Sequence, residues 1–417
     1  MTSPATSPPV EAPPGGDAES GQRASSSHEL SDRTLVAVTA AVTLPILWMG
    51  YGTDIDVTDV VASAESIRRG DYTPSRPPGV PVFEAIAAVL DPIGGHLLLN
   101  LVTAVAGAAT VVGIARLVRA WGHANGDLVA LAFLASPAAI IASTSTGDFV
   151  WALAFLVWGT LLHLRDRPVA AGVLLALAIG TRLSSVLLIV ALLVADGWAR
   201  DRRRPGLRTL AVALPLGALL YLPPWLAYDR SAEILDTAEG WRSFTNNLGR
   251  FIYKNYVTAG ALFLVVVLVA APALLAALRR WDRDPLLRAG VLGFAVSQAL
   301  FFVLPWKYNH LLPALVMLLL WLAASDRNRR PFLWVAIAAL AVNGVVTFRP
   351  LAPDTPHVAR SGRWDPALVQ GLLVNDIGCR LDAMREPLAP LNGDAWPCTL
   401  EPMRGAEGEA SSDGGGS

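Results

Sequence analysis

Residues 168–198 read PVAAGVLLALAIGTRLSSVLLIVALLVADGW, an apolar run interrupted only near its centre. The run is longer than the roughly 20 residues that one helix needs to cross the hydrocarbon core of a membrane. Its polar centre is GTRLSS at Gly180–Ser185, and a charged side chain such as Arg182 is costly in mid-bilayer. The pattern predicts two helices joined at a break, where Arg182 faces water or protein.

Further apolar runs precede and follow this one. Hydrophobic residues make up 53% of the 417 positions and charged residues only 16%, which is far more apolar than soluble domains. The other runs occupy residues 34–50, 95–118, 128–146, 149–164, 208–227, 257–278, 288–304, 309–323 and 331–348. With the split run, they predict an all-α polytopic membrane protein with about eleven transmembrane helices, several of them short.

Arginine clusters predict the orientation, because loops rich in Lys and Arg tend to stay in the cytoplasm. A cytoplasmic N-terminus places every cluster at a cytoplasmic end, provided that the 168–198 run crosses twice. The clusters are Arg116 and Arg119; Arg165 and Arg167; Arg200 and Arg202–Arg204; Arg279, Arg280 and Arg283; and Arg327, Arg329 and Arg330. The predicted extracytoplasmic segments are then 51–94, 228–256, 306–310 and the tail from 349 onward.

Both ends of the chain are polar. Residues 1–33, rich in Pro, Ser, Ala and Gly, predict a disordered cytoplasmic tail before a transmembrane domain at 34–348. Residues 349–417 predict an extracytoplasmic tail with a disordered end. This tail holds both cysteines, Cys379 and Cys398, which form a disulfide in an oxidising compartment or else are two free thiols. The net charge of -1 gives no bias toward nucleic acid, which is not an expected partner, whereas the apolar runs make membrane lipids one.

An acidic group follows the first apolar run directly. Asp54, Asp56 and Asp59 stand within six positions in GTDIDVTDVV. Carboxylates at such a place serve as a general base, hold a divalent cation through hard oxygen ligands, or form a solvated loop. The spacing leaves these three interpretations open.

A proline-rich segment, GDYTPSRPPGVPVFE, continues the same loop from Gly70 to Glu84. Its prolines restrict the backbone around Arg76, and a guanidinium held in this way suits a phosphate or a carboxylate. The alternative is a rigid connector whose arginine contacts lipid headgroups. Glu84 opens an expected amphipathic helix that lies along the membrane interface before the second span.

Four motifs together resemble the GT-C superfamily of integral-membrane glycosyltransferases. They are the Asp-x-Asp after the first helix, the SRPPG-type segment, GTRLSS at Gly180–Ser185 and PWKYNHLLPAL at Pro305–Leu315. The similarity is closest to the branch related to protein O-mannosyltransferases and aminoarabinose transferases. It implies inverting transfer of a sugar from a polyprenyl-phosphate carrier to an extracytoplasmic glycan, lipid or protein acceptor.

The resemblance also implies roles for particular residues. By position after the first helix, Asp54 matches the family's catalytic acidic residue, with Asp56 as its close second. Basic residues of later outer turns bind the donor phosphate in the family, which here means Arg182, Lys307 and His310, with Arg76 from the first loop. The bland alternatives are a snorkelling Lys307, a helix-end His310 and a structural Arg182.

Further polar residues are expected to line the substrate cavity. Asp148, in STSTGDFVW, follows a polar stretch that no lipid-facing helix would choose. Tyr308 and Glu84 complete this set. Many relatives carry an adjacent acidic pair where Ile55 here separates two aspartates, so the sequence leaves open whether a divalent cation such as Mg or Mn takes part.

A transporter or lipid flippase is the chief alternative, since many helices, a broken helix and an intramembrane arginine also describe secondary transporters. Transporters usually contain paired repeats, and the sequence has no repeat of fixed period. The charged residues also gather at one predicted face of the membrane. A noncatalytic scaffold would explain the helices but not the outer carboxylates opposite outer cations.

Overall fold

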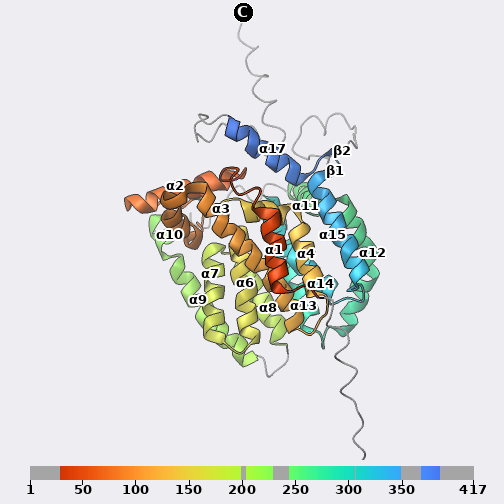
Figure 1. Cartoon of the computed structure of the whole chain (residues 1–417). Helices are drawn as coiled ribbons and strands as arrows, with labels where there is room; N and C mark the ends of the chain where they lie inside the picture. Colours follow the sequence, from red (N-terminus) through yellow and green to blue (C-terminus); the bar gives the residue numbers. More distant parts are fainter. Residues whose placement is uncertain (1–28, 199–202, 229–243, 306, 349–367, 386–417) are drawn as a thin grey trace, which may run out of the picture.

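The apolar runs fold as helices, because backbone N–H and C=O groups in hydrocarbon must find their partners within the same segment. A computed structural model describes residues 29–198, 203–228, 244–305, 307–348 and 368–385. In these ranges the helices stand side by side as a bundle with a small two-stranded sheet at one end (Figure 1). The helices are α1 (Asp32–Thr43), α2 (Ile55–Arg69), α3 (Pro81–Ala120), α4 (Gly126–Ala135), α5 (Pro137–Thr144), α6 (Phe149–Leu164), α7 (Pro168–Thr181), α8 (Ser185–Asp196), α9 (Arg203–Leu220), α10 (Leu222–Ala227), α11 (Phe244–Ala259), α12 (Ala261–Ala277), α13 (Pro285–Val303), α14 (Leu312–Ala323), α15 (Arg330–Val345) and α17 (Leu372–Arg385), with short 3-10 helices η3 (Leu278–Arg280) and η4 (Tyr308–Leu311).

The predicted all-helical membrane architecture is confirmed. Among the described residues, four helical segments are long and apolar enough to cross a membrane: Pro81–Ala120, Arg203–Ala227, Ala261–Arg280 and Pro285–Val303. Helices α4 and α5 make a fifth span if the pair, bent by 75°, is taken as one. Five shorter apolar helices of 10–17 residues, among them α6, α7 and α8, accompany them. By length and composition, the described residues therefore contain four to five full-length candidate spans, and the predicted total of about eleven passes, short ones included, is not confirmed.

The break in the 168–198 run lies where the sequence predicts it. Helix α7 ends at Thr181 and α8 begins at Ser185, and Arg182 caps α7 with extended backbone angles (φ -150°, ψ 115°). Helix α7 packs against α6 and α9, whereas α8 packs against α13. Because the chain turns at Arg182, this side chain can leave the helix axis and reach a neighbouring segment.

The first predicted outer loop contains two helices, one more than expected. Helix α2 begins directly after Asp54, and Gly70 ends it in the left-handed conformation (φ 76°). Its buried face, including Val60 and Ala64, packs on the first limb of α3. That limb ends at a kink where Gly95 has φ 54° and ψ -147°, so one long helix supplies both the expected interfacial helix and the second span.

The arginine-bearing turns gather at the end of the bundle where α1 begins. Arg116, late in α3, lies 2.6 Å from Asp32 at the start of α1. His123, in the following turn, lies 3.2 Å from Asp284, the N-cap of α13. Helices α2 and α17 and the β1–β2 pair lie at the opposite end (Figure 1).

A short part of each polar terminal region packs on the bundle. The Leu30 amide donates to Asp127 Oδ2 at 3.0 Å, and Glu29 pairs with Arg119 at 3.0 Å. Near the other terminus, β2 (Leu368–Gln370) pairs antiparallel with β1 (Val346–Phe348) and leads into α17. Residues 1–28, 349–367 and 386–417 lie outside the described residues, as does Cys398, so the disulfide to the buried Cys379 stays a prediction.

Candidate active site

Three carboxylates meet at the end of the bundle that carries α2. Asp54 is the N-cap of this helix, and its Oδ1 accepts a hydrogen bond from the Asp56 amide at 3.0 Å. This capping preference explains why an Asp-x-Asp pair begins the helix. Asp148 is the N-cap of α6 and is only 2% exposed, whereas the side chains of Asp54 and Asp56 are 19% and 16% exposed.

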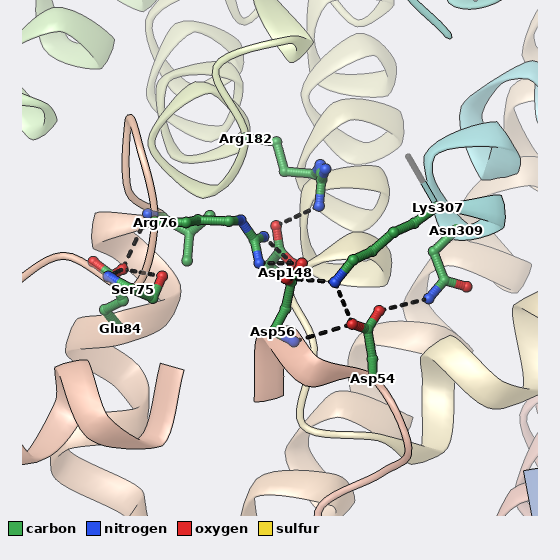
Figure 2. A network of polar contacts seen from close by, with 10 residues as sticks. Asp54, Asp56, Ser75, Arg76, Glu84, Asp148, Arg182, Lys307 and Asn309 are labelled. Carbon is green, nitrogen blue, oxygen red and sulfur yellow. Dashed lines mark hydrogen bonds and ion pairs between the residues drawn. The ribbon is translucent and has the colours of Figure 1, made fainter. Parts of the chain in front are cut away.

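Two arginines from distant segments share Asp148 (Figure 2). Arg76 Nη2 donates to Asp148 Oδ1 at 3.2 Å, and Arg182 Nη1 donates to Asp148 Oδ2 at 2.7 Å. Through its other terminal nitrogen, Arg76 also pairs with Asp56. The planar guanidinium of Arg76 therefore bridges two carboxylates, which the point charge of a lysine would not do in the same geometry.

Lys307 reaches the carboxylates from the opposite side of the site (Figure 2). Its Nζ pairs with Asp54 and lies 2.5 Å from Asp56 Oδ1. Asn309, two residues further along the chain, donates from Nδ2 to Asp54 Oδ2 at 3.3 Å. Asn309 was not singled out from the sequence, although it stands between two residues that were, Lys307 and His310.

A buried carboxylate holds the loop that presents Arg76. Glu84 is fully buried and accepts hydrogen bonds from the Ser75 amide at 2.8 Å, Ser75 Oγ at 2.5 Å, the Val80 amide at 3.3 Å and the Tyr72 hydroxyl. These bonds brace the loop, and the expected role of Glu84 in lining the substrate cavity stays a prediction. Its effect on the site acts through the placement of Arg76.

An aromatic ring supports Arg182. The guanidinium carbon of Arg182 lies 4.0 Å from the centroid of the Phe149 ring, which is a cation–π contact. In this position the guanidinium still donates to Asp148 through Nη1. The His310 ring packs against Phe149 as well, with 5.5 Å between the two ring centroids. His310 thus lies beside the cluster, and Tyr308 lies half-buried at the start of η4.

The charges of the cluster influence one another strongly. Burial by itself would raise the pKa of the Asp56 carboxyl, but Arg76 and Lys307 outweigh burial and hold this pKa well below its usual range. Burial raises the pKa of the Asp59 carboxyl, and the negative charges of Asp56 and Asp54 add to the rise. The site therefore keeps Asp56 ionised against its cations, whereas the pKa of Asp59 shifts in the opposite direction.

The two turns that carry the carboxylates lie against each other. The Thr146 amide donates to the Tyr51 carbonyl at 2.7 Å. Next to this bond Gly52 has φ 125°, and a Cβ there would lie 2.7 Å from Ser145 Cβ. Only glycine allows this approach, because a side chain would meet both backbone strain and a collision. The contact brings the Asp54 turn and the Asp148 turn to one place.

Among the described residues, no group of three or more His, Cys, Asp or Glu side chains is arranged to hold a metal ion. The oxygens of the three site carboxylates pair with the cationic side chains of Arg76, Arg182 and Lys307. The part of the chain that the structure describes thus presents ion pairs at the position where the sequence left a divalent cation open.

Comparison with solved structures finds a protein with a similar fold. A solved structure, that of ArnT from Cupriavidus metallidurans bound to undecaprenyl phosphate, matches 72% of this chain with a TM-score of 0.51 and 19% sequence identity. This chain spans 61% of the length of the ArnT chain. No curated protein is significantly similar to the chain in sequence. At this identity the match shows that the fold of this chain is similar to that of ArnT.

A family model gives the narrower assignment. The model of glycosyltransferase family 87 matches residues 76–305, which is more than half of the chain. The matched region begins at Arg76, includes Asp148 and Arg182, and ends just before Lys307. The chain belongs to glycosyltransferase family 87.

Proposed function

We propose that the protein transfers a sugar from a polyprenyl-phosphate carrier to a hydroxyl group of an acceptor on the outer face of the membrane, with inversion at the anomeric carbon. One observation carries this proposal: three cations from three distant segments and three carboxylates converge at one end of the bundle. A transfer of this kind needs a base for the acceptor and positive charge for the departing phosphate. The ArnT structure, bound to undecaprenyl phosphate, supports a lipid-linked donor.

Asp54 is the residue best suited to act as the base. Its Oδ2 accepts only a 3.3 Å hydrogen bond from Asn309 among the bonds described, and its side chain is the most exposed of the three carboxylates. In the proposed step, Asp54 takes the proton of the acceptor hydroxyl while the oxygen attacks the anomeric carbon. The bond between that carbon and the phosphate oxygen breaks, and its electron pair leaves with the polyprenyl phosphate.

Arg76, Arg182 and Lys307 are the proposed partners of the donor phosphate. Each already holds a carboxylate at hydrogen-bonding distance, so each has a geometry that a phosphate oxygen can adopt in turn. Binding would exchange a carboxylate partner for the phosphate at one or more of these cations. Asp148, nearly inaccessible and held by two arginines, is the proposed counter-ion and not a second base.

The proposed topology places the N-terminus in the cytoplasm and the site outside. It is supported by the positive-inside tendency, because Arg116 and its neighbouring turns lie at the end of the bundle opposite the carboxylates. With the short helices counted as passes, this arrangement has about eleven crossings. The acceptor belongs to one of three classes, a glycan, a lipid or a protein, and the sugar is a hexose or a pentose.

The test is sugar transfer by the purified protein in nanodiscs, supplied with polyprenyl-phosphate sugars and candidate acceptors. Asp54→Asn should lower kcat by about 10²- to 10⁴-fold, the usual contribution of a general base. Glu65→Gln is the matched control, since Glu65 is an exposed carboxylate on the same helix as Asp56 and should leave kcat unchanged. Full turnover by Asp54→Asn would refute the assignment. Movement of the lipid across liposomes without any sugar transfer would favour a flippase instead.

A further inference from the structure

Helix α17 contributes a fully buried ion pair at the same end of the bundle as the proposed active site (Figure 1). Asp376 is 0% exposed and Arg380 is 1% exposed, and Arg380 Nε lies 2.8 Å from Asp376 Oδ2. The two residues are one helical turn apart, so both project from the same face of the helix. Asp376 stands 323 positions after Thr53, the residue directly before the site carboxylate Asp54.

Each member of the pair reaches one of the two turns that carry the site carboxylates. Asp376 Oδ1 accepts a hydrogen bond of 2.5 Å from the hydroxyl of Thr53, the residue directly before Asp54. On the other side, Arg380 donates from Nη1 to the Thr144 carbonyl at 2.8 Å. Its Nη2 donates to Ser145 Oγ at 2.5 Å, three residues before Asp148.

The burial of this pair requires an explanation beyond stability. Removing two charges from water is costly, and apolar side chains of similar volume often stabilise a protein as well or better. What an apolar pair does not supply is a set of directed bonds to two separate backbone segments. Those segments are the ones that already meet through the Thr146 amide, the Tyr51 carbonyl and the close approach of Gly52 to Ser145.

We propose that Asp376 and Arg380 are positioning residues that hold the Asp54 turn and the Asp148 turn in register with each other. The inference rests on the proposed function for its catalytic meaning, since the two turns present the base and the counter-ion of the transfer. The tail after the last span is thereby a working part of the active site. A displacement of about 1 Å in a reacting group can cost about 10²-fold in rate, so the brace need move the turns only slightly to matter.

The experiment compares Thr53→Val, Asp376→Asn, Arg380→Ala and Arg380→Lys with wild type in nanodiscs. Thr53→Val keeps the side-chain shape and removes only the hydroxyl that Asp376 accepts from. Val374→Ala, at a partly exposed position of α17, is the matched control. Two quantities are measured: kcat and donor KM for sugar transfer, and hydrogen exchange of backbone amides at residues 51–56 and 143–148.

A positioning role predicts that kcat falls by about 10- to 100-fold in Thr53→Val, Asp376→Asn and Arg380→Ala, with the donor KM unchanged. Arg380→Lys should recover part of the loss, because one of the two donated bonds can re-form. Amide exchange should rise in both turns and remain at the wild-type level in α8. In the double variant Thr53→Val/Asp376→Asn the two losses should not add fully, since the first change removes and the second weakens the same hydrogen bond between α17 and the Asp54 turn.

A lower melting temperature with unchanged kcat and unchanged exchange in both turns would overturn the proposal and leave α17 a purely stabilising element. The exchange measurement does not depend on the reaction. If wild type transfers no sugar, the proposed function fails, while faster exchange confined to the two turns still supports the brace. If wild type transfers sugar but the variants keep both the wild-type exchange in the two turns and the wild-type kcat, the brace alone is refuted.

Discussion

Substitutions at the two ends of the Arg182–Asp148 ion pair should move donor affinity in opposite directions. Arg182→Gln removes a cation that the donor phosphate is expected to contact. Asp148→Asn keeps the side-chain shape but removes the charge that competes with the phosphate for that cation. If Asp148 is a displaceable counter-ion, the first variant should bind the donor more weakly and the second more tightly.

The size of the effect follows from the geometry of the pair. Arg182 Nη1 lies 2.7 Å from Asp148 Oδ2, and only 16% and 2% of the two side chains are exposed. Unit charges about 4 Å apart interact by about 4 kcal/mol at an effective dielectric constant of about 20. Because Arg76 shares Asp148, we assign about half of this energy to the exchange of Arg182. A difference of about 2 kcal/mol is about 30-fold in affinity.

The assay is equilibrium binding of a polyprenyl phosphate to the protein in nanodiscs at constant salt. Arg182→Gln should raise Kd by about 30-fold, whereas Asp148→Asn should lower it by up to the same factor. The double variant should lie between them. Glu65 and Arg69 form a comparable but exposed pair, 2.9 Å apart on α2, and substitution of either residue to Gln should leave Kd unchanged. Equal weakening by both single variants would refute the counter-ion role and identify the pair as a rigid structural unit.

Three further outcomes are expected. Gly52→Ala should lower both the melting temperature and kcat, because its Cβ would lie 2.7 Å from Ser145 Cβ at a φ of 125° and push the two carboxylate turns apart; thermal denaturation and transfer assays test this. Glu84→Gln should destabilise the protein by about 1–3 kcal/mol, because an amide cannot accept all four of the hydrogen bonds that hold the Arg76 loop; an unchanged melting temperature would contradict it. Since Arg76 holds the pKa of Asp56 below its usual range despite burial, Asp56 stabilises the fold above about pH 4 and loses this effect as the pH falls further; Asp56→Asn should therefore flatten the acid limb of the stability profile.

Some site residues could be predicted from local sequence, because a charge within or next to an apolar run is costly in lipid unless it has a polar partner. Arg182 interrupts a long apolar run, and a charge in that place must leave the lipid, which predicted both the helix break and a polar contact. Asp54 and Asp56 stand directly after an apolar run, where an aspartate also caps a helix. Lys307 was indicated in a different way, by the family resemblance of the segment Pro305–Leu315.

Other features depend on contacts that no local pattern encodes. Asp376 and Arg380 stand in a polar segment whose composition resembles a loose tail, and only docking on the bundle gives them partners. Glu84 was predicted to line the substrate cavity, and the four hydrogen bonds by which it braces the Arg76 loop could not be read from the sequence. The total of about eleven passes stays a prediction, because several apolar runs form helices of 10–17 residues whose length alone does not show whether they cross the membrane.

The equal number of cations and carboxylates in the cluster has a consequence for how a ligand arrives. A group of charges with no net excess has a field that fades within a few ångströms, well inside the Debye length of about 8 Å at physiological ionic strength. Such a site does not draw anions from solution by long-range electrostatic steering, so free inorganic phosphate is not concentrated there. A lipid-bound phosphate has no need of such attraction, since diffusion in the plane of the bilayer already delivers its headgroup to the rim of the protein.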